Sequence, residues 1–277
     1  SVYFRQNATV CNFSKRESWV VLSEIEQRIK AKIEAVGVPL KHWDINIYRG
    51  ILTGYNEAFI IDGKKKDELI AEDPKSAEII RPILRGRDIK RYGYDFADLW
   101  LINSHNGIKE KGVKRIEIND YPSIKKHLDQ YYPQLEKRAD KGDTPYNLRN
   151  CAYMEDFSKQ KIAWNRIASE KLFSLVDEGI IIQDSMHFFT GNHLKFLCAI
   201  LNSKLFSWFM YLIIGDTAGG NAGNSDNIRN LTIPKPNREL EIQIERLIKS
   251  EQYREIDKVV YKLYDISEQE IAFIDAQ

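Results

Sequence analysis

The sequence lacks the short motifs that mark the common nucleotide-dependent and hydrolytic enzymes. It contains no GxxxxGKS or GxxxxGKT phosphate loop, no GxGxxG after a predicted strand, and neither HExxH nor GxSxG. A pocket for a dinucleotide or for S-adenosylmethionine is therefore not indicated. The five histidines are scattered, and no carboxylate pattern is distinctive enough to assign a nuclease centre. We accordingly predict no catalytic residue and no metal site in this chain.

Cysteines and long apolar runs are also scarce. The cysteines Cys11, Cys151 and Cys198 are far apart and form no CxxC pair, which argues against a zinc knuckle or a disulfide framework. This usage is typical of a reducing cytoplasm. No apolar run reaches the ~18 residues of a membrane span, since polar residues interrupt the nearest one, 196–214. A secretory signal is absent as well, so we predict neither a membrane partner nor secretion.

The composition is that of an ordinary soluble globular protein. The 277 residues suffice for one large domain or two smaller ones, and 43% are apolar and 29% charged. Because the chain begins at Ser1 rather than Met, we expect a fragment of a longer polypeptide, although a processed tag would look the same. The net charge of +1 does not indicate nucleic-acid binding, but a local basic patch can bind phosphate at near-zero total charge.

Hydrophobic patterning predicts an α+β (mixed α/β) fold, in which a strand-rich centre is followed by a helical tail. The predicted helices are 17–36, a short one at 74–80, 122–140, 195–214, 238–249, 252–263 and 267–275. The predicted strands are 43–48, 58–61, 99–102, 161–165, 172–176, 180–183 and 231–234. We divide the chain into a helical connector (1–40), a strand-rich domain (41–236) and a helical tail (237–277).

One polar segment stands between two apolar runs. Gly50, Thr53, Gly54 and Asn56 lie between apolar residues at 45 and 47 and an apolar run at 59–61. The pattern predicts strand, tight loop, strand, with loop side chains that can make directed hydrogen bonds. In the major groove, the side-chain amide of asparagine can form two hydrogen bonds with adenine, one through its oxygen and one through its nitrogen. The local alternative is a turn in which Asn56 takes a left-handed conformation.

A second segment, 81–92, holds five cations and one carboxylate. Arg85 and Arg87 flank Gly86, and a glycine lets the backbone approach a partner closely. A guanidinium group can form bidentate hydrogen bonds with a phosphate or with guanine O6 and N7, and this segment offers two such groups. The alternative is a solvated surface with a few ion pairs.

Other loops place a tyrosine or an amide beside an arginine. These pairs are Tyr146 with Arg149, Asn165 with Arg166 after a predicted strand, and Asn224 with Arg229 in the polar stretch 215–230. A long polar loop of this kind usually marks a binding loop or disorder. The helices at the two chain ends could instead belong to the core or connect this domain to another.

Several segments together resemble the TaqI-like specificity domain. They are 49–61 with its GIxTGxNxAF core, 81–90 (RPxLRGRDIK), 121–128 (YPSIKKHL), 201–203 (LNS) and 263–271 (LYDISEQEI). The family is the target recognition part of type II restriction–modification enzymes, which join endonuclease, adenine-N6 methyltransferase and specificity module in one polypeptide. Its role is similar to that of the specificity subunit in type I systems. The resemblance covers most of the chain, roughly 40–275.

The resemblance implies that residues 41–236 recognise a sequence in double-stranded DNA and position a separate methyltransferase, with or without a nuclease, on its target. The partners would be double-stranded DNA and the methyltransferase domain of the same polypeptide or complex, in a prokaryotic cytoplasm. The Asn/Asp-Pro-Pro-Tyr/Phe motif and the glycine motif of the parent enzymes are absent here. We therefore expect no cofactor in this chain, and assign S-adenosylmethionine and Mg to other domains of the parent, which must flip an adenine out of the stack.

Two sets of candidate residues follow from the loops and the resemblance together. The expected phosphate-binding residues are Arg85, Arg87, Lys90, Arg91, Lys64, Lys65 and Lys66. The expected base-reading residues are Thr53, Asn56, Tyr146, Arg149, Asn165, Arg166, Asn224 and Arg229. Two other functions stay open: a protein-interaction scaffold that uses its terminal helices without reading bases, and a nuclease with an unrecognised carboxylate site.

Overall fold

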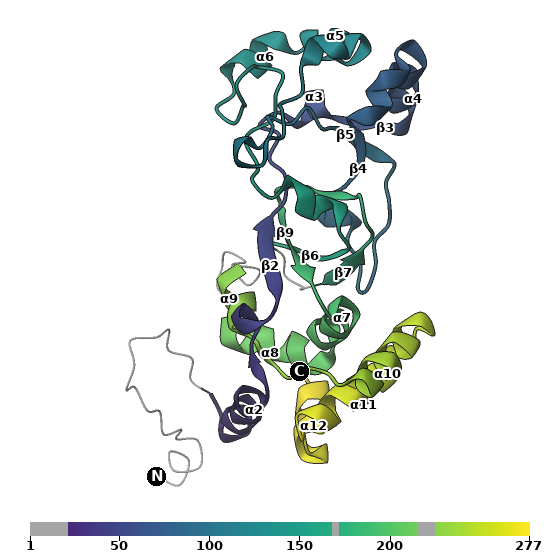
Figure 1. The fold of residues 1–277 in the computed structure, drawn as a ribbon. Helices are drawn as coiled ribbons and strands as arrows, with labels where there is room; N and C mark the ends of the chain where they lie inside the picture. Colours follow the sequence, from purple (N-terminus) through teal and green to yellow (C-terminus); the bar gives the residue numbers. More distant parts are fainter. Residues whose placement is uncertain (1–21, 168–171, 215–224) are drawn as a thin grey trace. The chain divides into compact units, whose positions relative to one another are not determined.

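The computed structural model describes residues 22–167, 172–214 and 225–277, and it confirms the predicted α+β class (Figure 1). The chain forms two compact units. Among the described residues, the strand-rich unit comprises 46–166 and 172–191, and the helical unit comprises 22–45, 167, 192–214 and 225–277. This division differs from the three consecutive segments proposed from the sequence, because the chain leaves the helical unit after residue 45 and returns to it at residue 192.

Two four-stranded sheets organise the strand-rich unit. Its strands are β2 (Ile45–Arg49), β3 (Ile60–Asp62), β4 (Ile80–Leu84), β5 (Leu99–Ile102), β6 (Lys161–Asn165), β7 (Phe173–Val176), β8 (Ile181–Ile182) and β9 (Met186–Gly191). In the first sheet the order is β2-β9-β6-β7, and β6 pairs antiparallel with both neighbours. In the second the order is β3-β5-β4-β8, where β5 is antiparallel to both neighbours and β8 joins β4 in parallel.

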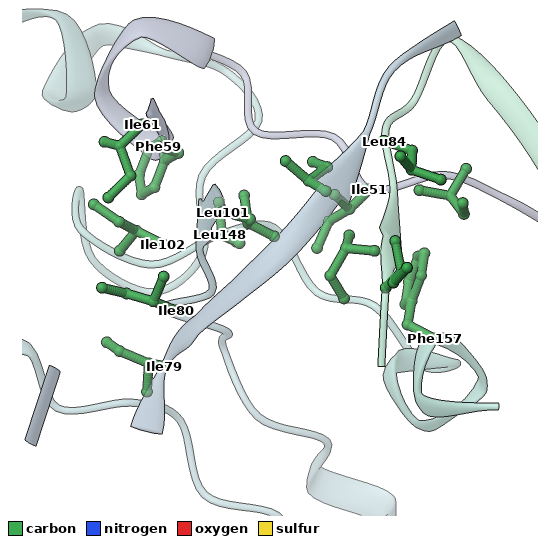
Figure 2. Packing of buried hydrophobic residues seen from close by; sticks show 14 of the residues in the cluster. Ile51, Phe59, Ile61, Ile79, Ile80, Leu84, Leu101, Ile102, Leu148 and Phe157 are labelled. Carbon is green, nitrogen blue, oxygen red and sulfur yellow. The ribbon is translucent and has the colours of Figure 1, made fainter. Parts of the chain in front are cut away.

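Short helices surround the second sheet. They are α3 (Asn56–Phe59), α4 (Gly63–Glu72), α5 (Pro122–Asp129) and α6 (Tyr132–Lys137), with 3-10 turns at Pro74–Glu78, Gly86–Asp88, Lys109–Lys111, Ile118–Asp120 and Met154–Ser158. The apolar side chains beneath them form one cluster, in which Leu84, Leu101 and Ile102 are fully buried (Figure 2). Burial of a large aliphatic side chain contributes about 1.5–3 kcal/mol. This core fixes the strand ends from which the polar loops emerge.

The helical unit contains a small antiparallel sheet and a series of amphipathic helices. The described elements are α2 (Glu24–Ala35), β1 (Val38–Pro39), a 3-10 turn (Leu40–His42), α7 (Leu194–Asn202), α8 (Lys204–Ile214), α9 (Ser225–Asn230), β10 (Thr232–Ile233), α10 (Arg238–Lys249), α11 (Tyr253–Leu263) and α12 (Glu268–Asp275). In these parts of the chain, no helix has the length and apolar character needed to cross a membrane.

A buried carboxylate connects α2 and α12 of this unit. Glu270 of α12 has a side chain that is 1% exposed, and it accepts from Lys32 Nζ of α2 at 2.7 Å. It also accepts from the backbone N–H of Ser267 at 2.7 Å, as in a capping box. Burial by itself would raise the pKa of Glu270, but the bonds from Lys32 and Ser267 outweigh it and lower the pKa to about 2.

Three local predictions were wrong. The segment 195–214 forms α7 and α8 rather than one helix, because Ser203 is extended and its hydroxyl donates to the Ile200 carbonyl in place of a helical bond. The segment 122–140 divides into α5 and α6, where Pro133 in the first turn of α6 has no N–H to continue a helix. The segment around Thr53 is not a tight loop, since the short helix α3 takes Asn56–Phe59 between β2 and β3, which belong to different sheets.

Candidate nucleic-acid interface

The turn at residues 183–185, between β8 and β9, holds two arginines from neighbouring strand ends. Arg49, the last residue of β2, donates from Nε to the Asp184 carbonyl at 3.4 Å and from Nη2 to Asp184 Oδ2 at 3.2 Å. Arg166, just after β6, donates from Nη1 to the same carbonyl at 3.4 Å. Gly50 permits this approach, since a Cβ there would lie 2.0 Å from the Gln183 carbonyl oxygen. The turn therefore gathers two guanidinium groups at one end of the first sheet.

The Arg-Gly-Arg segment lies against the same turn. Asn165 Nδ2 donates to the Gly86 carbonyl at 2.9 Å. A Cβ on Gly86 would lie 2.2 Å from Asn165 Oδ1 and 3.5 Å from Ser185 Oγ, so a larger residue at 86 would displace the Asn165 amide. The neighbouring Arg87 is exposed, and within the described ranges its side chain makes no hydrogen bond or ion pair. We call the set Arg49, Arg87, Asn165, Arg166, Asp184 and Ser185 the arginine surface.

Arg85 has a different environment from Arg87. Its guanidinium binds Asp88 through Nε at 3.1 Å and Nη2 at 2.9 Å, and its backbone N–H donates to the same carboxylate at 2.8 Å. Burial tends to raise the pKa of Asp88, but these bonds prevail and hold it below the ordinary value. The Arg85–Asp88 pair thus shapes the 3-10 turn that carries Arg87.

The other predicted phosphate-binding cations lie outside the arginine surface. Lys90 is exposed and pairs with Asp95 at 3.3 Å, and Arg91 is exposed beside it. The three lysines 64–66 lie on α4, where Lys65 pairs with Glu68 and Lys66 lies 4.3 Å from the Trp100 ring centroid. Their predicted phosphate contacts stay predictions.

A second polar cluster is organised by a buried arginine. Arg138 is 7% exposed and donates to the carbonyls of Thr53, Asp140, Pro145 and Asn147. Burial lowers the pKa of Arg138 to about 10, partly offset by Asp140, so the group stays protonated at neutral pH. Arg138 therefore ties the loop at Thr53 to the loop at residues 140–147.

The predicted base-reading residues of these two loops already have intramolecular partners. Thr53 is 2% exposed, and its hydroxyl donates to Asn56 Oδ1 at 2.6 Å. The Tyr146 hydroxyl donates to Asp129 at 2.5 Å, and Arg149 pairs with Asp140 at 3.3 Å. Asn56 is exposed and is the first residue of α3, so it does not take the left-handed conformation of the turn alternative.

Of the last pair of candidates, only Arg229 belongs to the described residues. Arg229 is exposed on α9 of the helical unit, 4.0 Å from Asp226. Asn224 lies outside the described residues, as do residues 215–223 of the polar stretch.

Four residues of the two clusters were not among the site residues predicted from the sequence: Arg49, Asp184, Ser185 and Arg138. Arg49 and Gly50 are the first residues of the segment 49–61. An arginine followed by a glycine at the end of a predicted strand was the sequence feature that could have identified Arg49. Asp184 and Ser185 follow an apolar strand without any distinctive spacing. For Arg138, nothing in the sequence distinguishes a buried arginine from a surface one.

Residues 81–220, half of the chain, match the family of the TaqI-like C-terminal specificity domain, and the chain belongs to this family. The matched segment includes Arg87, Asn165, Arg166 and Asp184, whereas Arg49 precedes it. The restriction–modification class expected from the resemblance is thereby confirmed. No curated protein sequence matches this chain.

Two solved structures have a similar fold. The type IIL restriction-modification enzyme MmeI in complex with DNA matches with a TM-score of 0.59 at 12% identity, over 87% of this chain and 36% of that one. The type IIG restriction endonuclease BpuSI matches with a TM-score of 0.54 at 15% identity, over 87% of this chain and 32% of that one. The present chain thus spans about a third of the length of each enzyme.

Proposed function

We propose that this chain recognises a sequence in double-stranded DNA and that the arginine surface contacts the duplex. The observation that carries the proposal is the convergence of Arg49 and Arg166 on Asp184, beside a segment that holds the exposed Arg87 next to Gly86. Guanidinium groups suit both phosphate oxygens and guanine edges, since they present several donors in a fixed plane. The fold shared with MmeI, whose structure contains DNA, supports the same conclusion.

Phosphate binding and base reading fall to different residues in this proposal. The exposed Arg87, Lys90 and Arg91 contact phosphates and set the register, which carries no sequence information. Asn165 and Arg166 read base edges beside Arg87. The roles of Thr53, Asn56, Tyr146 and Arg149 as further readers stay predictions.

The chain supplies recognition and other parts of the parent supply chemistry. We propose that it positions a methyltransferase domain of the same polypeptide or complex on its target, with or without a nuclease. S-adenosylmethionine and Mg would then bind outside this chain. The purified chain should accordingly show no methyl transfer.

The proposal is tested by the salt dependence of duplex binding, measured by fluorescence anisotropy for the wild type and Arg87→Ala. Each lost phosphate contact should lower the slope of log K against log salt by about 0.9. The control is Lys126→Ala, which removes a cation whose side chain is 70% exposed on α5. We expect weaker binding and a smaller slope for Arg87→Ala and no change for the control.

Two results would count against this function. A wild-type chain that binds no duplex would favour the scaffold function, in which the terminal helices make the contacts. An Arg87→Ala variant with an unchanged slope would remove the arginine surface from the interface.

A further inference from the structure

The Arg49 guanidinium is held along one edge only. Its Nε and Nη2 atoms, which form the side edge of the group, donate to the carbonyl and the carboxylate of Asp184. Within the described residues, Nη1 makes no hydrogen bond or ion pair. The end edge formed by Nη1 and Nη2 therefore keeps two donors in one plane for an external acceptor pair.

This edge is accessible and its position is fixed. The Arg49 side chain is 44% exposed, whereas the Asp184 side chain is 25% exposed. The backbone around Arg49 is held on both sides, since its carbonyl accepts from the Tyr153 hydroxyl at 3.0 Å and the Gly50 N–H donates to the Met186 carbonyl at 2.9 Å. A long side chain fixed in this way loses less conformational entropy when it binds.

Asp184 makes a phosphate a poor partner for Arg49. A carboxylate beside the guanidinium neutralises its charge locally and repels an approaching phosphate. Guanine presents a neutral acceptor pair, O6 and N7, that matches the end edge of an arginine. Phosphate contacts do not require a fixed side chain, whereas base reading does.

We propose that Arg49 reads one guanine of the target in the major groove and that Asp184 is the positioning residue that aims it. The inference rests on the proposed function and deepens it, because it names a specificity-determining pair. It also assigns a role to a residue that precedes the segment matched by the family.

The test is selection of duplexes from a randomised pool by the 277-residue chain, followed by sequencing. The variants are Arg49→Ala, Arg49→Lys and Asp184→Asn, with Lys126→Ala as the control and melting curves for all. Arg49→Lys keeps the positive charge but loses the planar fork. We expect both Arg49 variants to lower the preference for guanine at one position by about 5- to 150-fold, and Asp184→Asn to lower it at the same position.

The outcomes separate this inference from the function on which it rests. A wild type that enriches no sequence contradicts both. A wild type that enriches a site, with Arg49→Lys retaining every guanine in it, contradicts the inference alone. If Arg49→Ala bound all duplexes more weakly without a changed preference, Arg49 would be a phosphate contact. That result would also overturn the inference that Arg49 reads a guanine.

Discussion

Replacing Arg138 by methionine should strongly destabilise the strand-rich unit. The substitution keeps much of the side-chain volume but removes the donors to four carbonyls, those of Thr53, Asp140, Pro145 and Asn147. Asn147 retains a second donor, the Gly142 N–H at 2.9 Å, so three carbonyls lose their donor. Leaving a buried polar group unsatisfied costs about 1–3 kcal/mol, and water can reach part of this site. We therefore expect a loss of about 3–5 kcal/mol in the free energy of unfolding, the range for breaking a buried charged network.

Urea unfolding of Arg138→Met measures this loss, and hydrogen exchange should show faster opening of the loops that Arg138 connects. The matched control is Arg149→Ala, which removes an arginine whose side chain is 59% exposed and paired with Asp140. Surface pairs of this kind contribute less than about 1 kcal/mol. A loss for Arg138→Met no larger than that for Arg149→Ala would show that water replaces the missing donors, and it would refute the reasoning.

Three further predictions concern single positions. Glu270→Gln should destabilise the fold by up to about 3 kcal/mol at pH 7. Lys32 helps to hold the pKa of Glu270 at about 2. The stability that ionised Glu270 contributes is therefore present above pH 4.5 and is lost on acidification toward pH 2. The unfolding curves of the wild type and Glu270→Gln should converge over that range. Gly86→Ala should displace the Asn165 amide and weaken duplex binding, and full binding with an unshifted Asn165 amide signal by NMR would contradict the close approach. Asn56→Ala should lower the melting temperature, because it removes the acceptor of the Thr53 hydroxyl. An unchanged preference among selected duplexes would remove Asn56 from the base readers, and loss of one adenine position would confirm that role.

Elements with strong local patterns were predicted well from the sequence. β5, β6 and α10 coincide with the predicted ranges 99–102, 161–165 and 238–249. The breaks at Ser203 and near Pro133 were missed, because local side-chain bonds and one absent N–H override a continuous apolar pattern. The association of residues 22–45 with 192–277 in one unit was not visible either, since it depends on contacts distant in the sequence.

The candidate site was predicted in part. The family and the segment around Arg87 were predicted from motifs, and the structure places Asn165 against Gly86 of that segment. Arg85 differs, because Asp88 lies three residues later and binds its guanidinium. Burial and pairing of this kind depend on the fold and leave no periodic signal in the sequence.

Contact between the arginine surface and DNA can be measured by site-specific cross-linking from Ser185. Ser185 is exposed, and its Oγ would lie 3.5 Å from a Cβ at Gly86, so a photoreactive residue at 185 lies within the arginine surface. The same group at Lys126 on α5 is the control. If the arginine surface contacts DNA, irradiation with a selected duplex should cross-link the variant at residue 185 and leave the control free. Equal yields at both positions, or a yield only at residue 126, would contradict the account.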